Sequence, residues 1–175
     1  MACGSDETQR IARGTTRVLS RDRLANCALT LRAATIADVP QLYQWRTDPE
    51  TRRQSFFQGV TPSGFRAHCS ALLLDVNTRV YVAEAAGIAA GTGQIAWQAD
   101  GSGAYAEISY TLAPECRGLR LAPHLVDLLT KEAQHLGHTR IVARVKAGNI
   151  ASLRALERSG YRIVETIIEL AYADR

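Results

Sequence analysis

The chain has 175 residues, 46% hydrophobic and 22% charged, a composition that favours one folded domain and excludes a disordered or fibrous chain. Its apolar runs are too short to cross a membrane, and its first residues do not resemble a secretory signal, so we expect a cytoplasmic protein. The net charge is +4, of which residues 1–26 carry +2, with five arginines against three acidic residues. The mildly basic remainder suits a small anionic ligand and argues against a nucleic-acid surface.

Cysteine and histidine spacing predicts neither a disulfide framework nor a metal site. The four cysteines are far apart in sequence, and the four histidines lack the spacing of a zinc hydrolase. We therefore expect reduced thiols, no metal, and no membrane partner; the sequence leaves open whether the chain is a monomer or a homodimer.

The first half of the chain predicts an irregular leader followed by mixed secondary structure. Residues 1–26 are polar and arginine-rich and form the predicted leader, so that residues 27–175 form a single domain. Residues 28–33 alternate in polarity and predict a strand, whereas residues 35–45 open with a capping pattern and predict a helix. A break at Asp48-Pro49 precedes a second predicted helix over residues 61–76, which begins on Thr-Pro.

The second half predicts a meander of strands and then alternating helices and strands. Glycine-containing turns separate three strands, which favours antiparallel hairpins. The predicted elements are strands at 80–85, 88–98 and 104–112, a helix over 121–137, a strand at 141–145, a helix over 149–159 and a last long or broken strand at 161–172.

A strand-to-helix turn at residues 117–122, with the sequence Arg-Gly-Leu-Arg-Leu-Ala, is the most informative segment. The first turn of the following helix has unpaired backbone amides and the positive end of the helix dipole, which can hold a phosphate or pyrophosphate. Arg117 and Arg120 add two positive charges at the same place.

This turn resembles the pyrophosphate motif Q/R-x-x-G-x-G/A of the GCN5-related N-acetyltransferases (GNAT). Arg117 and Ala122 match the motif, whereas Arg120 replaces its central glycine. Residues 149–161 resemble a second segment of the family, beginning with Asn149 and Ser152 and ending in Gly-Tyr. The resemblance extends over residues 28–170.

The resemblance implies an α+β fold, an α/β/α sandwich with helices on both faces of a mixed, mostly antiparallel sheet that splays between its fourth and fifth strands. It also implies acetyl-CoA as co-substrate, with its arm along the edge of the fourth strand. The implied cofactor-binding residues are Thr111, Leu112, Arg117, Gly118, Leu119, Arg120, Leu121, Ala122, Asn149 and Ser152.

The same resemblance implies direct transfer of acetyl to an amine, which must lose a proton before it attacks. Glu107, a carboxylate in an apolar stretch, is the predicted base. Many family members have a tyrosine seven residues after the motif asparagine as the acid, but here that residue is Leu156. Tyr110 is the substitute candidate, and a thiolate that leaves unassisted is the alternative.

Residues 45–56 predict the acceptor site, with Trp45 to stack on a sugar and arginines to hold a diphosphate. This stretch resembles acetyltransferases of pseudaminic and related nonulosonic acid pathways, which acetylate a UDP-linked amino sugar. The implied acceptor residues are Trp45, Arg46, Arg52, Arg53 and Ser55. Acetylation of protein amino termini or small amines is the alternative, and an acetyl-CoA-binding module without catalysis is a third.

Overall fold

The computed structural model describes Leu24, residues 27–57 and residues 59–164. The predicted leader, apart from Leu24, and the part of the last predicted strand beyond residue 164 lie outside these residues. Leu24 is buried and packs against the core. No helix in the described part of the chain combines the length and the apolar character needed to cross a membrane.

A single five-stranded sheet forms the centre of the fold, and its strands follow one another in chain order. The first four strands pair antiparallel, whereas the last pair is parallel, which gives the mixed sheet that the sequence predicts. The strands are β1 (Leu29–Ala33), β2 (Thr78–Ala85), β3 (Ile88–Asp100), β4 (Gly103–Leu112) and β5 (Ile141–Val142).

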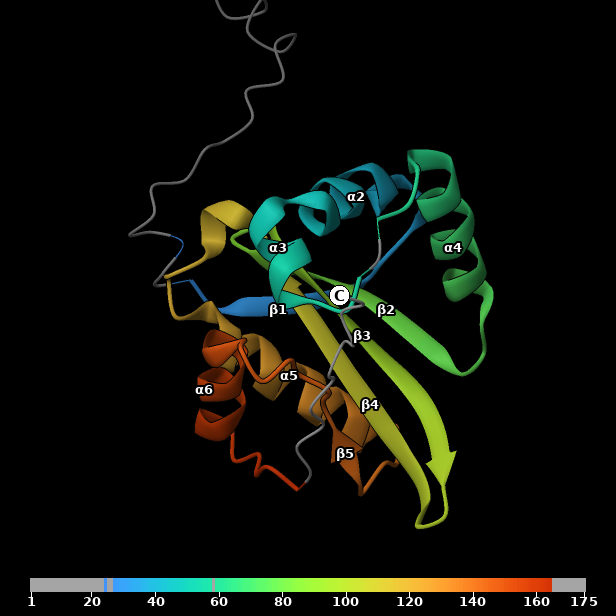
Figure 1. Cartoon of the computed structure of the whole chain (residues 1–175), viewed down its shortest axis with the longest axis vertical. Helices are drawn as coiled ribbons and strands as arrows, with labels where there is room; N and C mark the ends of the chain where they lie inside the picture. Colours follow the sequence, from blue (N-terminus) through green and yellow to red (C-terminus); the bar gives the residue numbers. More distant parts are fainter. Residues whose placement is uncertain (1–23, 25–26, 58, 165–175) are drawn as a thin grey trace, which may run out of the picture.

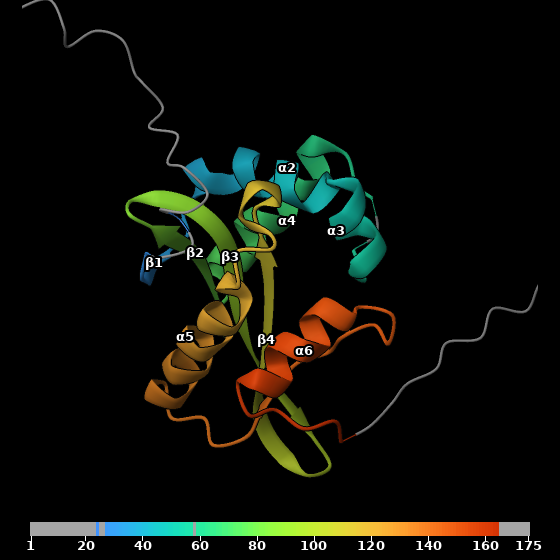
Figure 2. The same cartoon turned by 90° about the vertical axis from the view of Figure 1, so that its left-hand side faces the viewer.

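Helices cover both faces of this sheet, as Figures 1 and 2 show. On one side lie α2 (Val39–Thr47), α3 (Pro49–Gln54) and α4 (Pro62–Leu74); on the other lie α5 (Leu121–His135) and α6 (Ile150–Arg158). Two short 3-10 turns, η1 (Ile36–Asp38) and η2 (Pro114–Cys116), precede α2 and α5. The α+β sandwich is therefore confirmed.

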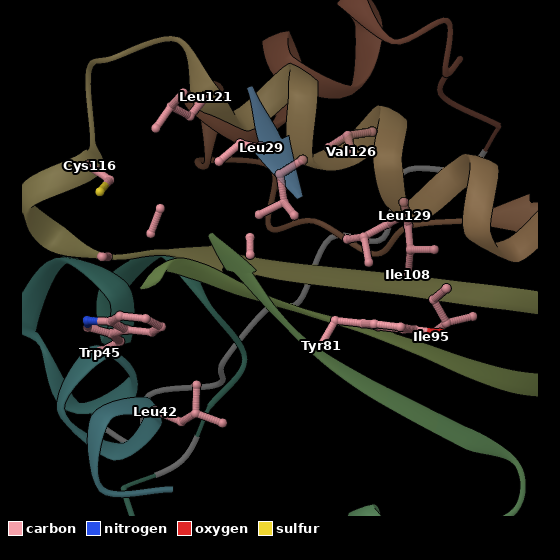
Figure 3. Packing of buried hydrophobic residues seen from close by; sticks show 14 of the residues in the cluster. Leu29, Leu42, Trp45, Tyr81, Ile95, Ile108, Cys116, Leu121, Val126 and Leu129 are labelled. Atoms are coloured by element: carbon pink, nitrogen blue, oxygen red, sulfur yellow. The ribbon is translucent and has the colours of Figure 1, made fainter. Parts of the chain in front are cut away.

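The core is divided between the two faces of the sheet (Figure 3). Trp45 of α2 packs on one side, and Leu129 of α5 packs on the other, near the fully buried Ile108 of β4. Gly93 on β3 allows this approach, because a Cβ at this position would lie 2.6 Å from a methyl carbon of Leu129. Packing against α5 thus accounts for Gly93 without any ligand.

Side-chain hydrogen bonds fix the start of the domain to the sheet. Arg32 of β1 donates to Asp38 of η1 at 2.7 Å and to Glu84 of β2 at 2.6 Å. These contacts connect β1 and the following turn η1 to the neighbouring strand β2, and they leave Arg32 fully paired.

The final parallel strand is shorter than expected. The sequence predicts a strand over residues 141–145, but β5 ends at Val142 and pairs only with Ala106 and Glu107 of β4. Residues 161–164, where the last strand was predicted to begin, form no strand. Within the described chain, β4 therefore continues for five residues beyond its last parallel partner, and the two strands diverge.

Candidate active site

A cavity of about 900 Å³ lies where β4 and β5 diverge. Its walls come from β4, from the turn before α5, from α6 and from the helices α2 to α4 on the other side of the sheet. The cavity therefore joins the segment that resembles a phosphate motif to the segment that is expected to hold the acceptor.

Backbone hydrogen bonds show which amides of β4 face this opening. The N–H of Ala106 donates to Arg140 on the β5 side, whereas the N–H of Ala113 donates to Ala90 of β3. Because successive residues of a strand present their amides to opposite edges, the amides of Ile108, Tyr110 and Leu112 face β5. β5 has no residues opposite them in the described chain, so this edge is open to another hydrogen-bonding group.

This geometry distinguishes two of the predicted cofactor residues. The sequence assigns Thr111 and Leu112 to the cofactor, but Thr111 pairs with Thr92 of β3 and its amide faces that strand. Leu112 remains at the open edge, and Ile108 and Tyr110 join it. Alternate residues of β4 present their amides to β3 and to the open edge. A sequence motif does not show which of the two edges a given amide faces.

The turn before α5 has a left-handed backbone at two positions. Gly118 has φ of 76° and Arg120 has φ of 60°, and Arg120 is the N-cap of α5. The left-handed region disfavours side chains with a Cβ, which explains why glycine suits the central motif position. The first turn of α5 leaves amides unpaired at the cavity, although Pro123 removes one of these donors.

Replacing Arg120 with glycine tests this backbone strain. Arg120→Gly is expected to raise the free energy of unfolding by up to about 1 kcal/mol, because glycine adopts the left-handed conformation without a Cβ clash. Arg120→Ala is the matched control, since it removes the guanidinium and keeps the Cβ. Urea denaturation measures the difference between the two variants; equal stabilities would show that the backbone carries no strain there.

The two signature residues of the cofactor motifs make contacts with α3. The guanidinium of Arg117 donates to Asp48 at 2.7 Å and to Thr51 at 2.6 Å, at the start of α3. At its other end, Asn149 donates from its amide to the backbone oxygen of Gln54 at 3.1 Å. The side-chain oxygen of Asn149 also caps α6 through the Ser152 amide.

These contacts change the interpretation of both residues. Arg117 lines the cavity, but its guanidinium donates to Asp48 and Thr51 of the protein, so it also has a structural role. Asn149 serves as the helix cap that its residue type favours. Together they hold the two ends of α3 and so connect the predicted cofactor side to the predicted acceptor side.

The predicted base and acid both line the cavity. One oxygen of Glu107 accepts from Arg144 at 2.6 Å, and Arg144 also donates to the hydroxyl of Tyr105. The hydroxyl of Tyr110 is buried without a hydrogen-bond partner among the described residues. Burial raises the pKa of Tyr110; nearby Ser152 opposes this shift, although its side chain does not reach hydrogen-bond geometry.

The remaining predicted cofactor residues divide by burial. Leu119 does not line the cavity, and Leu121 is 1% exposed, so its side chain belongs to the core although its backbone starts α5. Leu156, at the family's tyrosine position, is also buried in the core. The predicted residues that do line the cavity are Thr111, Leu112, Arg117, Gly118, Arg120, Leu121, Ala122, Asn149 and Ser152.

The prediction for Trp45 is wrong. Its side chain is 2% exposed and packs in the core, because the apolar face of α2 turns toward the sheet. It therefore offers no ring face to a sugar. Arg46 and Ser55 line the large cavity, whereas Arg52 and Arg53 line a second hollow of about 480 Å³ on the outer side of α3, which Ser55 also reaches.

Several cations at these sites were not predicted. Arg154 and Arg158 of α6 line the large cavity, and Lys146 lines the second hollow. Arg154 and Arg158 are four residues apart, so helical periodicity after Asn149 was a signal that placed them on one face. Arg144 and Lys146 carry no such signal, because they lie in an irregular segment.

Sequence and structure comparisons agree with this geometry. A family model described as an acetyltransferase (GNAT) domain matches residues 28–162. The combination of a splayed sheet, an open β4 edge and a helix N-terminus at one cavity is that of an acetyltransferase that uses acetyl-CoA. The chain belongs to the GNAT acetyltransferase domain family. No curated protein matches the chain in sequence.

Three solved structures illustrate the fold. Spermidine N-acetyltransferase from Vibrio cholerae, in complex with CoA and spermine, is 19% identical, with a TM-score of 0.74 over 84% of this chain and 88% of that one. AAC(6')-Ib with paromomycin and acetyl-CoA is 19% identical, with a TM-score of 0.67 over 75% and 81%. A predicted acetyltransferase from Clostridium acetobutylicum, with acetyl-CoA, is 18% identical, with a TM-score of 0.61 over 82% and 96%.

Proposed function

We propose that this enzyme transfers an acetyl group from acetyl-CoA directly to the primary amine of an anionic acceptor, of which a UDP-linked amino sugar is the leading candidate. The observation that carries the proposal is the cavity at the open edge of β4, which brings edge amides, a carboxylate and an unpartnered tyrosine hydroxyl to one place. Acetyl-CoA supplies an activated acyl group whose leaving group is a thiolate.

The residues at the cavity fit this co-substrate. The outward amides of Ile108, Tyr110 and Leu112 would hold the pantetheine arm, and one of them would stabilise negative charge on the thioester oxygen. The first turn of α5 would hold the diphosphate. Arg154 and Arg158 would add positive charge on the α6 side.

Glu107 would accept the proton that the acceptor ammonium loses. Arg144 fixes one of its carboxylate oxygens at 2.6 Å, while the other has no hydrogen-bond partner among the described residues. A fixed orientation with one available oxygen suits a general base. No covalent acetyl-enzyme is needed, and the buried Cys116, which is 1% exposed, takes no part.

Tyr110 would protonate the departing thiolate, and a hydroxyl deletion tests this role. Tyr110→Phe is expected to lower kcat about 100-fold, because the raised pKa keeps this hydroxyl protonated and able to donate at neutral pH. The free energy of unfolding should not fall, since the hydroxyl has no partner to lose.

Steady-state kinetics and urea denaturation of the same variant separate the two effects. Tyr43→Phe is the control, because it removes a hydroxyl that donates to Val60 away from β4. Unchanged turnover in Tyr110→Phe would leave the thiolate to depart unassisted.

The charges around the cavity favour an anionic acceptor over a polyamine. Glu50 and Glu107 are its acidic lining residues in the described chain. The cations that line it are Arg46, Arg117, Arg120, Arg144, Arg154 and Arg158. Arg52, Arg53 and Lys146 surround the second hollow, which would hold a nucleotide diphosphate beside the exposed ring of Phe56.

A thiol-release assay with acetyl-CoA tests the proposal against its alternatives. The panel contains UDP-linked amino sugars, the corresponding free amino sugars, spermidine, an aminoglycoside and amino-terminal peptides. We expect the highest kcat/KM with a UDP-linked amino sugar. Preference for spermidine or a peptide would overturn the acceptor class, and acetyl-CoA binding by calorimetry without turnover of any amine would identify a binding module.

A further inference from the structure

Arg46 is a cation inside the large cavity that lacks an acidic partner in the described chain. It lies in the last turn of α2 and lines the cavity beside Leu42 of the same helix and Phe65 and Cys69 of α4. No hydrogen bond or ion pair of its guanidinium is found among the described residues, and the surrounding side chains on α2 and α4 are mainly apolar.

The acidic groups near Arg46 are already engaged. Glu50, which lines the same cavity, accepts from Arg53 and from the side chain of Gln54. Asp48 accepts from Arg117 and from Thr51. Glu107, the other acidic residue that lines the cavity, pairs with Arg144, so Arg46 has no ion pair with a carboxylate among the described residues.

The electrostatic neighbour of Arg46 is the thiol of Cys69. Burial raises the pKa of that thiol, although Arg46 opposes the shift, so the thiol is neutral at pH 7. Burial also lowers the pKa of the Arg46 guanidinium from its ordinary value. The charge of Arg46 is therefore partly removed from water and uncompensated within the protein.

Buried charges in proteins are normally paired, because the free energy lost when a charged group leaves water exceeds what packing contacts alone contribute. Here the unpaired guanidinium faces a cavity rather than packed protein, so a bound ligand can supply the missing charge. We infer that Arg46 forms an oxyanion subsite on the α2–α4 side of the cavity, which binds a carboxylate or phosphate group carried by the acetyl acceptor. The inference rests on the proposed function and places the anion of the acceptor beside α2 and α4, where the guanidinium fork of Arg46 would bind it.

The first test needs no acceptor. Arg46→Met keeps the apolar stem and removes an uncompensated charge, so the melting temperature of the ligand-free protein is expected to rise by about 2–6 °C. Arg32→Met is the matched control: it breaks two ion pairs and should lower the melting temperature by about 1–4 °C. A fall in Arg46→Met, or its failure to fold, would show that Arg46 is structural and would overturn the inference.

The second test uses simple anions as probes. Sodium phosphate and sodium acetate, at constant ionic strength, should raise the melting temperature of the wild-type protein by about 1–3 °C more than that of Arg46→Met. Arg46→Lys keeps the charge and loses the fork, so it should respond less than the wild type. Equal responses in the wild type and Arg46→Met would contradict the subsite.

The third test compares acceptors that differ only in the anion. An amino-sugar phosphate is compared with its free sugar, and an amino acid with its amide, so the two arms separate phosphate from carboxylate. Arg46→Met should lower kcat/KM about 10- to 100-fold for the favoured anionic acceptor and by a much smaller factor for its neutral counterpart. An equal loss of kcat/KM for the anionic and the neutral acceptor would overturn the inference. Absence of turnover in the wild type would refute the proposed function, and the two thermal tests would then decide whether the subsite exists.

Discussion

Glu107→Gln is expected to lower kcat about 100- to 10,000-fold while the Kd for acetyl-CoA changes by less than about 3-fold. Glutamine keeps the shape of the side chain and still accepts a hydrogen bond from Arg144, but it cannot take a proton from the attacking ammonium. Stopped-flow or thiol-release kinetics give kcat, and calorimetry gives the Kd.

Two companion variants define this effect. Glu157→Gln on the exposed side of α6 does not line the cavity and should behave as the wild type. Arg144→Gln removes the ion pair and retains the carboxylate, so it should retain more activity than Glu107→Gln. If Glu107→Gln weakens acetyl-CoA binding as much as it slows turnover, or does neither, Glu107 is not the base.

Asp48→Ala is expected to have the largest effect on stability, a loss of about 2–4 kcal/mol in the free energy of unfolding. The carboxylate of Asp48 caps α3 through the Thr51 amide at 2.9 Å and accepts from Arg117 at 2.7 Å. Removing it uncaps the helix and leaves the partly buried Arg117 without this partner. The melting temperature should fall by about 4–12 °C.

The same variant tests whether α3 connects the two halves of the site. Because α3 carries Arg52 and Arg53, its displacement should raise the acceptor KM about 10-fold or more and affect the acetyl-CoA Kd less. Asp48→Asn is the matched control: asparagine caps a helix well but does not pair with Arg117. An unchanged acceptor KM in Asp48→Ala would separate α3 from the acceptor.

Acid should produce a related loss. Burial acts to raise the pKa of Asp48, but hydrogen bonds from Thr51 and Arg117 prevail and lower it below its ordinary value. A carboxyl group whose pKa is lowered in the folded state stabilises the protein at pH values above its pKa in the unfolded state, which is about 4. This contribution is lost as the pH falls through the pKa of the folded state. The stability difference between wild type and Asp48→Ala should therefore narrow below about pH 4.

The order of elements was predictable because local patterns determine it. Alternating polarity identified the strands, and cap residues identified the helix starts at Thr35 and Thr61, which the structure confirms. The short helix α3 was not predicted, because Asp48-Pro49 was interpreted only as a break in the chain. The length of β5 was not predictable, because an apolar run of five residues does not reveal how many have a partner strand. That difference matters, since the short β5 is what exposes the edge of β4.

Functional contacts were harder to predict than the family. The motif residues Arg117 and Asn149 are where the family pattern puts them, yet their side chains contact α3, a helix that a local motif does not include. Trp45 is an aromatic residue of the kind that can stack on a sugar. Its ring is buried instead, because it lies on the face of α2 that packs against the sheet. Sequence spacing does not report the direction of a side chain relative to a distant element.

The sequence by itself determined the family, the main helices and strands, and the strand-to-helix turn before α5, because each depends on residues close together in the chain. Tertiary structure alone decided which β4 amides are open, that the ends of α3 are held by the cofactor motifs, and that Arg46 faces the cavity without an acidic partner in the described chain. These features arise where segments distant in sequence meet, so partner, direction and burial are defined only once the sheet and its helices have packed.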